Sequence, residues 1–153
     1  MTKKSKLIID ELIQTNNIIG KALDAFMLSL EKCRKIEIKE NMSFEEQESF
    51  DSLTSKYARL SDMYSQKYLT TIFIYLRENP KSFIDKANLA EKLNLVESYS
   101  QLLDLRDLRN EISHEYIIEE LTELYKNVIS YADVLINSIN QSRRFVSEKI
   151  TNP

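Results

Sequence analysis

The sequence has few of the residues that turn a chain sharply. Its 153 residues include one glycine, Gly20, and two prolines, Pro80 and Pro153. Tight turns usually need such residues, so we expect a small number of long elements. Hydrophobic residues make up 42% of the chain and charged residues 29%, as in ordinary globular proteins. With Leu, Ile, Lys, Glu and Ser abundant, the composition predicts an all-α fold, and the length predicts a single domain over residues 1–153.

The chain also lacks cysteine pairs, metal-binding clusters and long apolar runs. Its single cysteine, Cys33, cannot form an internal disulfide, which fits a reducing cytoplasm. One histidine, one cysteine and scattered carboxylates give no convincing metal site, so we expect no metal and no cofactor. No apolar run approaches the roughly 20 residues of a membrane span, and the start, MTKKSKLIIDEL, is not a signal peptide. The expectation is a cytoplasmic protein with no membrane contact.

Positive charge is not in excess. The formal net charge is −3 and the sequence pI is about 5.3. Broad nucleic-acid-binding surfaces are normally basic, so such a surface is disfavoured and we expect no DNA partner. A local site where two or three arginines meet one phosphate is still compatible with this balance.

Apolar residues recur at three- and four-residue steps, which predicts amphipathic helices. Ser43 and Glu46 have the spacing of a capping box, which starts a helix, and Asn79 before Pro80 ends one. The predicted helices are Ser5–Lys39, Phe44–Glu78, Ser82–Asn94, one that begins near Glu97 or Ser98, and Ile117–Ser147. Three long and two short helices with brief connections predict an antiparallel helical bundle.

The only histidine, His114, lies in the stretch RDLRNEISHEY. On a helix with about 100° per residue, the apolar stripe of Leu102, Leu105, Leu108 and Ile112 faces the core, and His114 points to the opposite side. Arg106, Asn110 and Ser113 share that outer arc, and Arg109 lies at the edge of the core-facing side. The plain interpretation is a solvated surface histidine. The alternative is a site in which these five side chains hold a phosphate and move a proton.

The segment Arg109-Asn110-x-x-x-His114-x-Tyr116 resembles the R-x4-H-x-Y signature of HEPN-domain proteins, and especially of the HepT-like toxins. The preceding hydrophobic helix, the long final helix and the chain length are also similar to that family. The specific part of the resemblance covers only these eight residues. It implies a helical bundle that forms a homodimer, with two copies of the motif facing each other across a cleft.

The resemblance also implies a function, that of a metal-independent ribonuclease. His114 would take a proton from a ribose 2′-hydroxyl or give one to the leaving oxygen, and Arg109 would stabilise charge on the phosphate. Asn110 would orient the histidine or the phosphate, and Arg106 and Ser113 would contact RNA phosphate. Each chain has one histidine, which cannot be acid and base at once, and a dimer would supply two.

The family further implies a partner. In HepT-like toxins a minimal nucleotidyltransferase, the antitoxin, adenylylates the motif tyrosine, here Tyr116. An added phosphate beside the site would repel RNA. Two other interpretations stay open: a non-catalytic substrate-binding or partner subunit of the nucleotidyltransferase, and a helical interaction protein whose motif has no chemical role.

Overall fold

The computed structural model describes residues 2–114 and 121–152, and these residues form helices and no strand. The elements in chain order are α1 (Lys3–Arg34), α2 (Phe44–Asp62), η1 (Met63–Tyr68), α3 (Leu69–Tyr75), α4 (Phe83–Lys92), α5 (Tyr99–His114), α6 (Leu121–Val146) and η3 (Ser147–Thr151). The segments η1 and η3 are π-helical and continue the helices before them. The predicted all-α bundle is confirmed.

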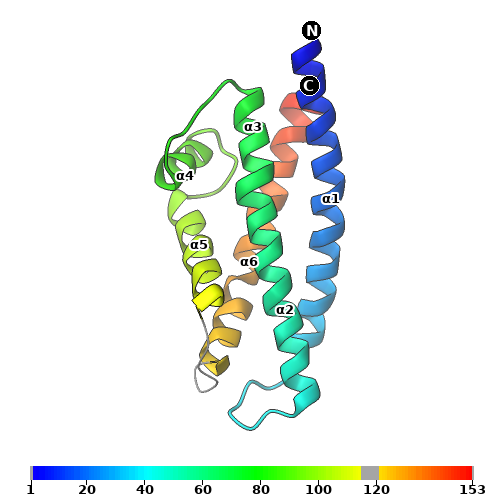
Figure 1. Cartoon of the computed structure of the whole chain (residues 1–153), viewed down its shortest axis with the longest axis vertical. Coiled ribbons are helices and arrows are strands. Elements are labelled where there is room, and N and C mark those ends of the chain that lie inside the picture. The colour runs from blue at the N-terminus through cyan, green and yellow to red at the C-terminus, as the bar shows by residue number, and fades with distance from the viewer. Residues whose placement is uncertain (1, 115–120, 153) are drawn as a thin grey trace.

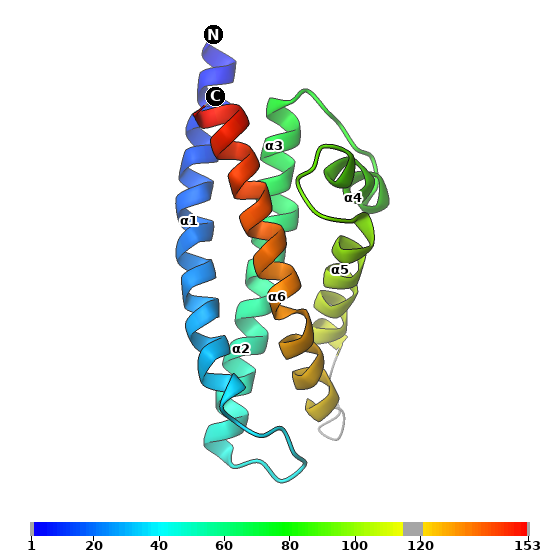
Figure 2. The ribbon, with the colours of Figure 1, turned by 180° about the vertical axis from the view of Figure 1, so that it is seen from behind.

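The helices run alongside one another in alternating directions (Figure 1). The helix α2 continues through η1 into α3, while α4 lies to one side of the bundle next to α5. Seen from behind, α6 crosses between α1 and α5 (Figure 2). The marked chain ends lie at the same end of the bundle, and α5 runs away from that end towards His114. None of the helices within the described residues is long and apolar enough to cross a membrane.

Side-chain caps fix where three helices begin. The Thr2 hydroxyl accepts a hydrogen bond from the Ser5 N–H, and the Ser82 hydroxyl accepts one from the Asp85 N–H. The predicted capping box is present, since Ser43 and Glu46 each accept from the other's backbone N–H. These bonds satisfy backbone donors that a helix start leaves free. The hydrogen bonds from Ser43 lower the pKa of the Glu46 carboxyl.

The first helix ends earlier than predicted, at Arg34 and not at Lys39. After it, Ile36 and Ile38 both lie partly buried against the core. A helix would place residues two apart on different sides, whereas extended chain places them on one side. The chain therefore leaves the helical path to bury both isoleucines, and the three- and four-residue periodicity gave no sign of this.

The second predicted helix, Phe44–Glu78, is the continuous run α2–η1–α3, which ends at Tyr75. The predicted inner positions from Phe50 to Ile72 are buried, and the largest fully buried side chains are Tyr57, Tyr64 and Tyr68. In η1 the Leu69 N–H bonds to the carbonyl of Tyr64, five residues back. The Lys86 ammonium of α4 donates to the Ser65 carbonyl at 3.0 Å. Residues of α4 therefore hold the π-helical segment in place.

The only glycine lies inside α1, where it allows a close approach. A Cβ on Gly20 would lie 3.0 Å from Nη2 of Arg143, which extends from α6. The Nε of Arg143 donates to the side-chain oxygen of Asn16 at 3.0 Å. The Tyr68 hydroxyl donates to the same oxygen at 2.9 Å. This cluster joins α1, η1 and α6.

Two helix ends adopt the left-handed conformation without glycine. Arg77 has φ of 60° and Asn94 has φ of 63°. Beside them, the Glu78 N–H donates to the Phe73 carbonyl and the Leu95 N–H to the Ala90 carbonyl, both at 2.8 Å. This six-residue closure is the Schellman motif, which usually has glycine at the left-handed position. Asparagine tolerates that conformation, whereas arginine is strained in it.

We therefore expect Arg77→Gly to raise the free energy of unfolding by about 0.5–1 kcal/mol, because glycine relieves the left-handed strain. The matched control is Arg59→Gly, since Arg59 is exposed within α2, where glycine costs about 1 kcal/mol. Urea unfolding followed by circular dichroism measures both. Destabilisation by both variants would contradict the strain at Arg77.

Candidate functional site

Five of the six candidate residues lie on α5, and the sixth, Tyr116, lies outside the described residues. The helix α5 is amphipathic, with Leu102, Leu105 and Leu108 buried as predicted. The hydroxyl of Tyr57 on α2 donates to the Leu105 carbonyl at 3.1 Å, which fixes α5 against the bundle. Its outer side is thereby left for polar residues.

Arg109 is held by a carboxylate from another helix. Its Nε donates to Oδ1 of Asp62 and its Nη2 to Oδ2, both at 2.9 Å. The two side chains are 28% and 35% exposed, so the pair is partly shielded from water. The hydrogen bonds that Arg109 donates to Asp62 raise the pKa of the guanidinium. Such a two-bond fork fixes orientation as well as distance.

Ser113 completes the surroundings of Arg109. The Nη1 of Arg109 donates to the Ser113 hydroxyl, one turn further along α5. The prediction placed Ser113 on the outer arc, and it is exposed there. In the structure its hydroxyl serves the arginine, while contact with RNA phosphate stays a prediction.

Arg106 lies differently from the outward orientation that was expected. Its guanidinium carbon is 4.7 Å from the centre of the Phe83 ring on α4, and its side chain is 36% exposed. Its Nε is buried without a hydrogen-bond partner in the described structure. Cation–aromatic attraction and burial of the aliphatic stem favour this position. The periodicity of α5 could not show that α4 covers this side.

Asn110 and His114 are both exposed and lie one turn apart at the end of α5. The pair runs beside the pair formed by Arg109 and Ser113, because four-residue steps follow one side of a helix. The last turns of α5 thus carry an oriented guanidinium, a hydroxyl, an amide and an imidazole. These groups can bind an anion and move a proton.

The neighbouring side of α5 is acidic. Asp104, Asp107 and Glu111 are exposed there. With residues of α6 they line a hollow of about 230 Å³. Within the described residues, no group of three or more His, Cys, Asp or Glu side chains is placed to hold a metal ion. A phosphate would therefore be attracted from the side of Arg109 and repelled from the side of Glu111.

Asp62, the main partner of Arg109, was not predicted from the sequence. It lies 47 residues earlier in the chain, on a different helix, and no motif marks it. The one available signal was physical. An arginine at the edge of a buried helix face needs an acceptor, and Asp62 comes directly after the inner positions Leu60 and Ser61.

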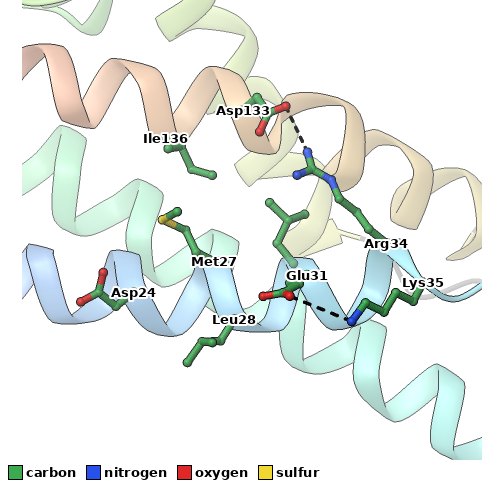
Figure 3. A pocket seen from close by; sticks show the side chains of 9 residues that line it. Asp24, Met27, Leu28, Glu31, Arg34, Lys35, Asp133 and Ile136 are labelled. Atoms are coloured by element: carbon green, nitrogen blue, oxygen red, sulfur yellow. Dashed lines mark hydrogen bonds and ion pairs between the residues drawn. The ribbon is translucent and has the colours of Figure 1, made fainter.

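A further hollow lies away from α5, between α1 and α6 (Figure 3). It measures about 710 Å³, and Met27, Leu28, Leu30 and Ile136 form its apolar lining. The ion pair between Arg34 and Asp133, at 3.1 Å, spans its rim. None of the five described candidate residues lines this groove. Its size alone gives no reason to place the chemistry there.

No family model matches the chain, and neither the curated proteins nor the solved structures gave a match. The resemblance to HEPN-domain proteins therefore stays a prediction.

We expect Arg109→Ala to lower the free energy of unfolding by about 1–2 kcal/mol, because it leaves the carboxylate of Asp62 partly buried without its cation. His114→Ala should change it by less than about 0.5 kcal/mol, because His114 is exposed. Thermal or urea unfolding of both variants checks this. Equal stability of Arg109→Ala and the native chain would show that the fork contributes nothing to the fold.

Proposed function

We propose that this chain is a metal-independent endoribonuclease of the HEPN type, the toxin of a pair whose antitoxin is a minimal nucleotidyltransferase. The observation that carries the proposal is the fixed orientation of the Arg109 guanidinium. Asp62 and Ser113 orient this guanidinium beside the outer side of α5, where Asn110 and His114 are exposed. A guanidinium has five N–H donors, and three bond to partners among the described residues, so two can bind one phosphate.

The proposed reaction uses the 2′-hydroxyl of RNA as the nucleophile. His114 removes its proton as the 2′-oxygen bonds to the adjacent phosphorus. Arg109 stabilises the negative charge that develops on the phosphate oxygens. The bond from phosphorus to the 5′-oxygen breaks, and this oxygen takes a proton from the His114 of a second copy. Asn110 orients the phosphate or the imidazole, and Arg106 and Ser113 contact flanking phosphates.

The homodimer is part of the proposal because each chain contains one histidine. Cleavage of one bond needs one general acid and one general base, and two copies of the chain supply the two imidazoles. The charge pattern on α5 is compatible with this arrangement. At about 100° per residue, Asp104, Asp107 and Glu111 lie away from Arg109, whereas Asp107 shares the side of His114, so RNA would approach from the side of Arg109. The proposed location is the cytoplasm, where RNA and the antitoxin would meet the chain.

The second candidate is a non-catalytic subunit that binds the nucleotidyltransferase or its substrate. Asp62 favours it, because it neutralises much of the charge that Arg109 could offer to a phosphate. In this case α5 would still be a contact surface, but no bond in RNA would break.

The test is cleavage of end-labelled RNA by the purified chain in the presence of EDTA. The native chain should cleave it, and His114→Ala should be slower by about 100- to 10,000-fold, the usual contribution of a general acid or base. Asn110→Ala should also be slower, and its matched control Asn17→Ala, an exposed asparagine on α1, should not. A folded native chain that leaves RNA intact would overturn the nuclease and favour the binding subunit.

The regulation is tested at Tyr116. Co-expression with a minimal nucleotidyltransferase antitoxin should add the mass of one AMP to the native protein and abolish RNA cleavage. Tyr116→Phe should escape both effects, because it lacks the hydroxyl that accepts the adenylyl group. Tyr99→Phe, at an exposed tyrosine of α5, is the control and should still be modified. An unchanged mass of the native chain would contradict the proposed antitoxin.

A further inference from the structure

Asp62 lies where two rigid segments meet. It is the last residue of α2, and the π-helical η1 begins at the next residue. Within η1, the buried Tyr64 hydroxyl lies 2.7 Å from the Ser142 hydroxyl of α6, and Lys86 holds the Ser65 carbonyl. The backbone that carries Asp62 is thus tied to both α6 and α4. A carboxylate on such a backbone has a fixed position and can therefore fix the orientation of the side chain that donates to it.

The partner of Asp62 is Arg109, a long side chain whose rotamer freedom the fork with Asp62 removes. A free arginine side chain samples many rotamers, which carry considerable conformational entropy. The fork takes one N–H from Nε and one from Nη2, and Ser113 takes one from Nη1. The remaining donors, one on each terminal nitrogen, then have a fixed direction. Two donors with a fixed direction match two oxygens of one phosphate.

We propose that Asp62 is a positioning residue, which acts through Arg109 by aligning these two free N–H groups with a single phosphate of RNA. The inference rests on the proposed function and deepens it. Asp62 touches neither RNA nor the reacting atoms. The negative charge of Asp62 weakens the overall attraction of the site for RNA. Its hydrogen bonds, however, orient Arg109 towards the single phosphate on which negative charge develops.

This positioning role predicts that loss of the Asp62 carboxylate lowers kcat without raising KM. Asp62→Asn keeps the size of the side chain but replaces one acceptor oxygen with an NH₂ group, so the fork cannot form. The variant should lower kcat by about 10- to 100-fold, since misplacement of a catalytic group by about 1 Å has an effect of this size. KM should stay equal or fall, because a negative charge near the RNA is removed. A higher kcat would show instead that Asp62 is an inhibitory counter-ion, and would overturn the proposal.

The matched control is Glu11→Gln. Glu11 on α1 also pairs with a cation on a different segment, Lys67 of η1, and it is 45% exposed. The substitution makes the same chemical change at an inter-helix ion pair away from α5. It should leave kcat and KM unchanged. An equal loss of kcat in both variants would assign the effect to general destabilisation and not to Arg109.

The decisive experiment is a double-mutant cycle on kcat with Arg109→Lys, measured on protein shown to be folded by circular dichroism. A lysine cannot form the fork, so Asp62→Asn should have no further effect on kcat in that background if Asp62 acts only through Arg109. Additive losses would overturn the proposal. If the native chain cleaves RNA and Asp62→Asn equals it in kcat, the positioning role alone fails. If the native chain and His114→Ala are equally inactive, the proposed function fails and this role fails with it.

Discussion

Three buried tyrosine hydroxyls on one continuous helix set the arrangement of the whole bundle. From the run α2–η1–α3, Tyr57 donates to the Leu105 carbonyl of α5, Tyr64 to the Ser138 carbonyl of α6, and Tyr68 to Asn16 of α1. A buried hydroxyl without a partner is costly, so each neighbouring helix has one favourable register against this run. Burial strongly disfavours the charged forms and raises the pKa of all three tyrosines.

The same constraint determines where the candidate site lies. Because Tyr57 fixes α5 by the carbonyl of Leu105, the side of the helix with Arg109 comes to face Asp62, five residues beyond Tyr57. The outer side, with Asn110 and His114, is then left exposed. The polar face of α5 therefore depends on residues of two helices. Its own sequence supplies the functional groups, and the central helix supplies the carboxylate that orients one of them.

Much of the fold could be predicted from the sequence because helical periodicity is a local signal. The inner positions of the second helix from Phe50 to Ile72 and the capping box at Ser43 were both read correctly. The end of α1 was placed too late, because the burial of Ile36 and Ile38 depends on the rest of the core. The π-helical segment η1 was also missed, because four-residue steps such as Tyr64 to Tyr68 fit an α-helix as well.

For the candidate site, the sequence could give the residues but not their partners. His114 and Asn110 are exposed on one side of α5 because their spacing alone determines it. The fork between Arg109 and Asp62, and the contact of Arg106 with Phe83, join residues that are far apart in the chain. Such contacts follow from the packing of α2 and α4 against α5, which no local pattern of α5 contains.

The central claim of the proposed function is that residues of the exposed face of α5 cleave RNA by attack of the RNA's own 2′-hydroxyl on the adjacent phosphate. The most direct measurement is the chemistry of the ends produced when the native chain cleaves RNA in EDTA, with His114→Ala run in parallel. The account predicts a 2′,3′-cyclic phosphate on one fragment and a free 5′-hydroxyl on the other, with neither formed by His114→Ala. Fragments with 5′-phosphate ends, or the same cyclic ends at the same rate from His114→Ala, would contradict it.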